Sequence, residues 1–328
     1  MARQSTRPTE QPADHRAHAP AARGPAPAPA RASGRAKGTA SSLGRAFQIL
    51  ELFTIASPVI QIDDVVRQLG YTRSTAYRYA KELCEAGLLT PAANAGQYSL
   101  GARIVELERL LVLTDPLYRA GHAVLDPLGQ DDRSLLLQSL SHGNQVLCIY
   151  KKGPEILQHG GLRVALNRSR GVPFPLFRGA ASLVILANLT LHRIRQTYLS
   201  DPARIAAAGL GQSWDEFRLL LAAIRRRGYA VSRSERKTPL VLGIAVPILL
   251  PAGKDSRVVG SLVQVCAHDL DAAQESAAFD YLRAAAERIA ARYVEYANGM
   301  VPAAAPHRKA GGGAPDDGTP IDGWQLIS

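Results

Sequence analysis

The sequence contains few cysteines and no long apolar run, and these two absences exclude several classes of protein. Its three cysteines, Cys84, Cys148 and Cys266, are far apart and form no Cys-x-x-Cys pair. Neither a zinc site nor a disulfide framework is therefore indicated, and this usage fits a reducing cytoplasm. The longest apolar stretch, at 180–191, is interrupted by polar residues and is too short to span a bilayer. We therefore expect no association with a membrane.

Catalytic and cofactor motifs are absent as well. The sequence has no Gly-x-Ser-x-Gly elbow, no Walker loop for phosphate, no His-Glu-x-x-His zinc motif and no Gly-x-Gly-x-x-Gly fingerprint after a strand. Its eight histidines are scattered along the chain. We therefore expect no enzymatic activity, no cofactor and no metal ion.

Basic residues are what the sequence has in excess: 39 Lys and Arg stand against 28 Asp and Glu, for a formal net charge of +11 at pH 7. Such a balance suits a polyanionic partner such as nucleic acid. The excess is uneven, because residues 1–40 hold seven basic and two acidic residues, whereas residues 41–110 hold seven of each. A DNA-binding surface within 41–110 must therefore concentrate its cations on one face.

Composition divides the chain into segments. Ala, Pro, Arg and Gly dominate residues 1–40, where large apolar residues are nearly absent, and residues 299–328 are also rich in Ala, Gly and Pro, so we expect two disordered tails. The first tail is either an arm that contacts DNA phosphates or an inert solubilising segment. Between the tails we expect a DNA-binding domain over 41–102, a linker helix over 103–115, and an effector-binding and oligomerisation domain over 116–298.

The segment after the first tail shows three short helical patterns followed by a hairpin pattern. Apolar residues recur at helical spacing over 43–53, over 62–69 and over 76–83. Gly70 is suited to end the second helix and Thr72 to cap the third, which leaves a connection as tight as that of a helix-turn-helix. Two short β-rich runs around a polar turn then predict a small hairpin, or wing.

The third of these helices carries the predicted DNA-binding face. The residues that we expect to contact DNA are Thr72, Arg73, Ser74, Thr75, Tyr77, Arg78 and Lys81. The N-terminal end of a recognition helix faces the bases, so Arg73 can make two hydrogen bonds to a guanine edge. Arg78 and Lys81 are better placed for phosphates, which position the protein without reading sequence. The alternative for this helix taken alone is a solvated polar face.

Downstream of residue 116, helical and strand patterns alternate, which predicts an α/β or α+β sheet domain. We expect helices over 117–128, 180–189, 215–227 and 279–296, and strands over 135–140, 145–150, 243–250 and 258–266.

Several segments carry a resemblance to a known family: Ser42-Leu43-Gly44-Arg45-Ala46, Leu50-Glu51-Leu52-Phe53, Leu69-Gly70-Tyr71-Thr72-Arg73-Ser74-Thr75-Ala76-Tyr77-Arg78, Gly87-Leu88-Leu89 and Tyr98-Ser99-Leu100-Gly101-Ala102-Arg103. They are similar to motifs of the IclR-type transcriptional regulators, and the resemblance continues more thinly to about residue 296. It implies a winged helix-turn-helix joined by a linker helix to a GAF/PAS-like effector-binding domain, in a homodimer or homotetramer.

The resemblance also implies an effector pocket over the sheet. Arg163, Arg168, Arg170 and Arg178 crowd the loop that walls it, and arginine binds carboxylates through paired hydrogen bonds. The residues that we expect at the effector are Arg163, Arg170, Arg178, Gly243, Gln264 and Cys266. For the last strand, the alternative is that the positions that match the family's polar residues lie one residue away from Gln264 and Cys266. The expected effector is a small organic or aromatic acid, and the alternative for the arginines is a solvated loop.

We therefore expect a transcriptional regulator, repressor or activator, that binds double-stranded operator DNA and responds to a small-molecule effector. It would act in the bacterial cytoplasm, on the nucleoid. Two other hypotheses stay open: a ligand-binding sensor whose helix-turn-helix contacts proteins, and a regulator that needs no effector.

Overall fold

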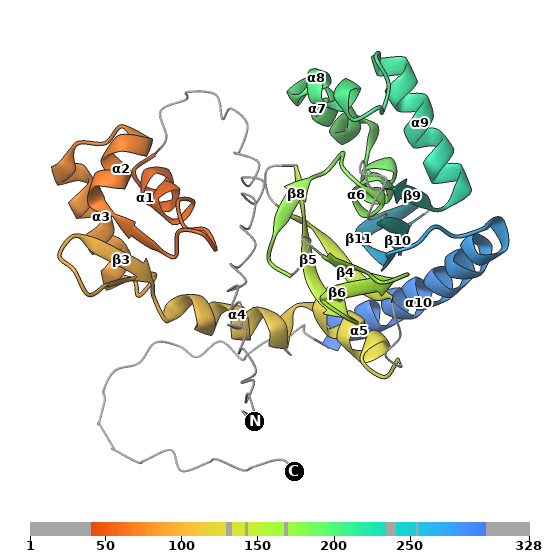
Figure 1. Cartoon of the computed structure of the whole chain (residues 1–328), viewed down its shortest axis with the longest axis horizontal. Helices are drawn as coiled ribbons and strands as arrows, with labels where there is room; N and C mark the ends of the chain where they lie inside the picture. The colour runs from red at the N-terminus through yellow and green to blue at the C-terminus, as the bar shows by residue number, and fades with distance from the viewer. Residues whose placement is uncertain are drawn as a thin grey trace, which may run out of the picture.

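The computed structural model describes residues 41–128, 133–141, 144–166, 170–233, 241–253 and 255–299. The two expected tails, apart from Gly299, and Arg168 lie outside these residues. The described chain forms an N-terminal lobe and a larger C-terminal lobe, which helix α4 (Arg103–Thr114) joins (Figure 1).

The N-terminal lobe contains three helices and a small sheet. Its elements are α1 (Ser42–Leu50), β1 (Val59–Gln61), α2 (Ile62–Leu69), α3 (Arg73–Glu85), β2 (Leu89–Pro91) and β3 (Gln97–Leu100). The strands are antiparallel in the order β1-β3-β2, and the β2–β3 hairpin forms the wing. Strand β1 was not expected, because it has three residues and only Ile60 is buried. Helix α1 ends at Leu50, before the predicted 53, because the chain turns at 51–52.

The connection between α2 and α3 confirms two predictions from the sequence. Gly70 adopts a left-handed conformation, with φ at 71°, and its N–H donates to the carbonyl oxygen of Val66. Only glycine takes this conformation without steric cost, so the second helix ends there. Thr72 caps α3, since its Oγ1 accepts a hydrogen bond from the backbone N–H of Thr75 at 3.3 Å.

The C-terminal lobe is built on a six-stranded antiparallel sheet with the order β8-β5-β4-β11-β10-β9. Its strands are β4 (Ser134–Ser141), β5 (Gln145–Lys152), β8 (Pro173–Pro175), β9 (Ala230–Arg233), β10 (Leu242–Ala252) and β11 (Asp255–Cys266). A separate hairpin pairs β6 (Ile156–His159) with β7 (Leu162–Ala165). Helices and antiparallel strands in this arrangement confirm the α+β prediction.

Helices cover both faces of this sheet. They are α5 (Pro116–Leu125), α6 (Ala180–Ala187), α7 (Leu191–Ser200), α8 (Pro202–Ala207), α9 (Trp214–Arg227) and α10 (Ala272–Gly299). Successive strand residues point to opposite faces, so Val246 and Leu262 share a core with α5 and α10, while Ala245 and Val263 share one with α6 and α9. Burial on both faces explains why β10 and β11 read as nearly continuous apolar runs.

Several elements differ from the sequence-based expectation. Helices α7 and α8 and the short strands β6 to β9 were not predicted, and α10 begins at Ala272 rather than at 279. The early start of α10 has a local cause: Asp271 Oδ1 accepts from the N–H of Gln274, and Gln274 Oε1 accepts from the N–H of Asp271. None of the helices in the described part of the chain is long and apolar enough to cross a membrane.

Candidate nucleic-acid interface

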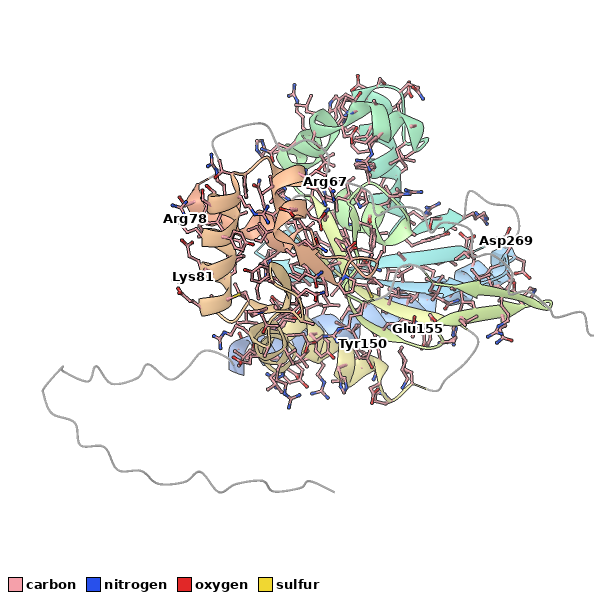
Figure 2. The ribbon with its side chains drawn as sticks, turned by 60° about the vertical axis from the view of Figure 1, so that its left-hand side comes forward. Arg67, Arg78, Lys81, Tyr150, Glu155 and Asp269 are labelled. Atoms are coloured by element: carbon pink, nitrogen blue, oxygen red, sulfur yellow. The ribbon has the colours of Figure 1, made fainter. Side chains whose placement is uncertain are left out.

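Helix α3 has one buried side and one exposed side. Ala76, Tyr79, Ala80 and Leu83 are buried in the core of the N-terminal lobe. The structure brings the seven predicted DNA-contacting residues together at the start of α3 and along its exposed side, with only Thr75 half-buried. Figure 2 shows Arg78 and Lys81 pointing outward from this helix. We call these seven residues the α3 face.

The hydroxyl groups at the start of α3 bond mainly to one another. Besides capping the helix, Thr72 Oγ1 donates to Thr75 Oγ1 at 2.8 Å and lies 3.2 Å from Ser74 Oγ. Thr72 and Thr75 therefore order the first turn of α3. Among the three, Ser74 is the exposed hydroxyl that does not cap the helix, and it stands beside Arg73 at the end that faces bases in helix-turn-helix proteins.

Each cation of the α3 face lies near an acid. The guanidinium Nη1 of Arg73 is 3.1 Å from Asp63 Oδ1 on α2. The other two pairs, Arg78 with Glu82 at 4.0 Å and Lys81 with Glu85 at 3.7 Å, lie within α3. Every side chain involved is more than half exposed, and exposed pairs contribute only about 0–1 kcal/mol. A DNA phosphate or base can therefore replace the acid at little cost.

The pair between Arg73 and Asp63 is the feature of the face that sequence reasoning missed. No acid lies between residues 71 and 81 in the sequence, which favoured a purely cationic stripe. The acid comes instead from the preceding helix, whose first turn carries Asp63 and Asp64. An acid in that first turn is favoured by the helix dipole, and the tight connection at Gly70 brings α2 next to α3.

The wing lies against the middle of α3. The hydroxyl of Tyr77 approaches Gly96 in the wing turn so closely that a Cβ atom there would lie 3.2 Å from it. Gly96 also has a positive φ of 76°, so two constraints favour glycine at this position. Within the wing, Asn94 Nδ2 donates to Gln97 Oε1 at 3.1 Å. The wing turn thus offers polar groups, without cations, beside the α3 face.

Tyr71 holds the helix-turn-helix connection against α1, a role that the sequence did not reveal. Its hydroxyl lies 3.1 Å from the carbonyl oxygen of Arg45 and 2.5 Å from Gln48 Oε1. Its ring meets the ring of Tyr79 edge to face, with 5.9 Å between centroids. Burial raises the pKa of the Tyr71 hydroxyl, so it remains a hydrogen-bond donor.

The strand residues expected at the effector do not share one pocket. Gly243 pairs with Val265, and a Cβ at Gly243 would meet Val263 on the side of α6. Gln264 and Cys266 occupy the alternate positions of β11 and face α10. The prediction of one pocket lined by Gly243, Gln264 and Cys266 is therefore wrong. Gln264 Oε1 accepts from Arg133 at 3.2 Å, and Cys266 is buried. In the alternative alignment of the last strand, which is shifted by one residue, Val263 and Val265 take the places of Gln264 and Cys266 and lie beside Gly243.

The predicted arginines also lie at different elements. Arg163 is exposed on β7, and Arg178 is exposed just before α6. Arg170 turns toward the linker helix: its guanidinium pairs with Glu108 of α4, and its Nε donates to the carbonyl oxygen of Ile149 at 2.9 Å. Arg170 is therefore the predicted effector residue whose contacts reach the linker between the lobes.

Comparisons with known proteins agree with this architecture. The family model described as the IclR helix-turn-helix domain matches residues 42–92. The chain is 26% identical over 229 residues to the HTH-type transcriptional regulator XynR of Escherichia coli (strain K12), covering 67% of this chain and 84% of that protein. This relative is a regulator rather than an enzyme.

Two solved structures have a similar fold. One is an IclR-type transcriptional regulator from Alicyclobacillus acidocaldarius, at 21% identity and a TM-score of 0.59, covering 77% of this chain and 98% of that one. The other is an IclR homologue from Microbacterium hydrocarbonoxydans complexed with 4-hydroxybenzoate, at 23% identity and a TM-score of 0.58, covering 78% and 100%.

Proposed function

Since this chain is an IclR-type transcriptional regulator, we propose that it binds operator DNA through the α3 face and that a small organic acid controls this binding. It would do so in the cytoplasm, where the operator lies. The observation that supports the DNA-binding surface most strongly is the placement of seven polar residues on the exposed side of a capped helix, opposite a tightly packed apolar side. The major groove of B-DNA is wide enough to admit such a helix.

The charges of the α3 face favour a specific mode of binding. Arg73 stands at the end of the helix that reads bases, whereas Arg78 and Lys81 lie farther along, where phosphates run. Because the segment 41–110 has no net charge, it offers little general attraction to DNA. Affinity would therefore depend on these few contacts and on the partner copy in a dimer.

The linker helix supports a homodimer as the DNA-binding form. None of the residues of α4 is buried, and it exposes five large apolar residues, namely Val105, Leu107, Leu110, Leu111 and Leu113. Exposed apolar surface of this extent on one helix is typical of a protein–protein contact. A second copy packed along α4 would place two α3 helices for two half-sites, about one DNA turn apart.

The acid effector is supported by chemistry shared with a structural relative. The Microbacterium hydrocarbonoxydans homologue is complexed with 4-hydroxybenzoate. In this chain, Arg163, Arg170 and Arg178 lie on different elements of the C-terminal lobe, and an arginine side chain can bind a carboxylate. We propose an aromatic or other organic acid as effector, whose binding changes the arrangement of the two DNA-binding lobes.

Promoter DNA from the genes that flank the coding region provides the test. Binding is measured by fluorescence anisotropy between 50 and 200 mM salt with the full-length protein, against random DNA of equal length. We expect specific binding that weakens steeply with salt, because phosphate contacts release counterions. Equal affinity for promoter and random DNA at every salt concentration would contradict the proposal.

A further inference from the structure

One cation of the N-terminal lobe has no acid beside it. Residues 41–102 hold five basic and five acidic residues. Four of the five cations lie near acids, in the pairs Arg67–Asp64, Arg73–Asp63, Arg78–Glu82 and Lys81–Glu85. The fifth is Arg45 on α1, which is exposed and whose guanidinium forms no ion pair or hydrogen bond with a described residue. In a lobe without net charge, this is the cation that remains uncompensated.

Helix α1 places Arg45 beside the start of α3. The hydroxyl of Tyr71, the residue before the N-cap Thr72, lies 3.1 Å from the backbone carbonyl oxygen of Arg45. The same hydroxyl lies 2.5 Å from Oε1 of Gln48, about one turn farther along α1. This side of α1 therefore faces the connection between α2 and α3.

The guanidinium of Arg45 also lies close to Tyr71. Burial raises the pKa of the Tyr71 hydroxyl, and the positive charge of Arg45 is the strongest influence that lowers it. Glu51, at the end of α1, raises this pKa slightly, but it forms no ion pair with Arg45 within the described lobe. Since Tyr71 directly precedes the cap of α3, the charge of Arg45 stands at the end of α3 that faces DNA in helix-turn-helix proteins.

Arg45 points away from the apolar residues that α1 exposes. Leu43 and Phe47 are 66% and 45% exposed. Each is two residues from Arg45, which is more than half a turn of an α-helix, whereas the two apolar residues are four apart and share one side. A protein contact through Leu43 and Phe47 would therefore leave the arginine accessible.

The absence of an acid partner distinguishes Arg45 from the cations of the α3 face. To contact DNA, Arg73, Arg78 and Lys81 must each leave an acid. Arg45 has no such partner to leave, so its whole charge attracts the DNA backbone. A guanidinium can also hold a phosphate through two parallel hydrogen bonds. A contact of this kind positions the protein and carries no sequence information.

We propose that Arg45 holds a phosphate of the operator backbone beside the groove that α3 enters, and that this anchor fixes the register of α3 on the DNA. The inference rests on the DNA-binding function proposed above and adds a contact outside the α3 face. Helices α1 and α3 then share the work: Arg73 meets base edges, while Arg45 holds the backbone next to them.

Fluorescence anisotropy with the full-length protein tests the anchor on promoter DNA and on random DNA of equal length. We expect Arg45→Gln to weaken binding to both by a similar factor, about tenfold, and to reduce the salt slope by about one per protein copy. Arg45→Lys keeps the charge and should retain the salt slope. Arg225→Gln, on the distant helix α9, removes an equal charge and should leave both quantities unchanged.

Promoter duplexes in which one phosphate at a time is replaced by an uncharged methylphosphonate locate the contact. With the wild type, replacing the phosphate that Arg45 holds should weaken binding by about tenfold. With Arg45→Gln, the same replacement should weaken binding no further, because the partner of that phosphate is already gone. If no replacement behaves in this way, Arg45 does not hold a particular phosphate.

Folding does not confuse these comparisons. The contact of α1 with Tyr71 uses the backbone carbonyl of Arg45 and the side chain of Gln48, so it survives the loss of the guanidinium. Arg45→Gln is therefore expected to unfold at a temperature close to that of the wild type, which a circular-dichroism melt checks.

Three further results would overturn the assignment. Wild-type affinity and salt slope in Arg45→Gln would show that Arg45 does not touch DNA. A loss confined to promoter DNA would make Arg45 a base-reading residue instead of an anchor. A loss in Arg45→Lys as large as that in Arg45→Gln would show that charge is not what the residue supplies.

The anchor and the proposed function can fail separately. If the wild type prefers promoter DNA and Arg45→Gln behaves identically, the function stands and the anchor is wrong. If the wild type binds promoter and random DNA equally, the function is contradicted, and the salt slope of Arg45→Gln on random DNA still decides the anchor. A wild type that binds no DNA overturns both.

Discussion

Arg73 shows how one side chain can be shared between two helices of the motif. Its guanidinium lies 3.1 Å from Asp63, yet the two side chains are 64% and 66% exposed. The pair orients the guanidinium at low energetic gain, so Arg73 remains available to a base edge. In the proposed DNA-binding mode, the guanidinium of Arg73 is therefore oriented before it meets a base.

Replacing this arginine should affect specific binding more than general binding. We expect Arg73→Ala to lower the affinity for promoter DNA by about 1–3 kcal/mol, with a smaller loss for random DNA. Arg78→Ala should weaken both by a similar factor and reduce the salt slope by about one. Fluorescence anisotropy measures both quantities.

Arg225→Ala, on the distant helix α9, serves as the control for lost positive charge. If Arg73→Ala and Arg78→Ala bind like this control, the α3 face is not the DNA-binding surface.

Cysteine reactivity separates buried from accessible thiols. Burial raises the pKa of Cys148 to about 12, so this thiol stays protonated at pH 8. Cys84 is only half-buried, although its pKa is also raised. We expect iodoacetamide at pH 8 to label Cys84 well before Cys148, as read by peptide mass spectrometry. Urea-unfolded protein, in which all three should react, is the control; equally fast labelling in the folded protein would refute the burial of Cys148.

At the scale of the element, α3 depends on its cap. Thr72→Ala removes the hydrogen bond to the N–H of Thr75 and should lower the stability of the N-terminal lobe by about 1 kcal/mol. Calorimetry of the lobe's unfolding transition measures the loss. The control is Ser74→Ala, because Ser74 makes no capping hydrogen bond, and this substitution should lower the stability of the lobe by less. Equal losses would show that the cap contributes little.

The linker helix α4 is the element that should control assembly. The double substitution Leu107→Ser and Leu111→Ser removes two neighbouring exposed leucines, at 44% and 50% exposure, and should shift a dimer toward monomer in light scattering. Leu219→Ser, an exposed leucine of α9 at 61%, is the control and should leave the mass unchanged. A dimer that survives the double substitution would exclude α4 as the contact.

The length of an element explains part of how well the sequence predicted it, although the ten-residue helix α7 was also missed. Helices α2, α3 and α9 and strands β10 and β11 span several periods of their pattern, so their type was predicted. Strands β1 and β8 have three residues each, too few for alternation to show. The faces of β10 and β11 could not be predicted either, because both sides of the sheet are apolar and only the register distinguishes Gly243 from Gln264.

At the scale of the whole molecule, the sequence predicted the order of the parts but not the contact between them. Arg170 was singled out as a carboxylate-binding residue, yet its partner Glu108 lies 62 positions away on the linker helix. Nothing in the pattern of either segment indicates that pair. It depends on how α4, α5 and β5 pack together.

This contact predicts coupling between the lobes. Glu108→Gln removes the ion pair that joins Arg170 to the linker helix, so an acid effector that acts through Arg170 should change promoter affinity less than it does in the wild type. Glu106→Gln, which breaks the pair with Arg103 on the same helix, is the control. Promoter binding measured by fluorescence anisotropy with and without 4-hydroxybenzoate gives the size of this effect. An equal effect of the two substitutions would show that the coupling does not pass through Arg170.

The two edges of the large sheet bear on how the regulator behaves when crowded on DNA. The sheet ends on its shortest strands, β8 with three residues and β9 with four. Strand β8 begins and ends with proline, which has no N–H to donate to a further strand. Along β8, the edge of the sheet therefore offers few backbone donors to a strand of another copy. Copies that gather at neighbouring operators would be protected from fibril-like pairing along this strand.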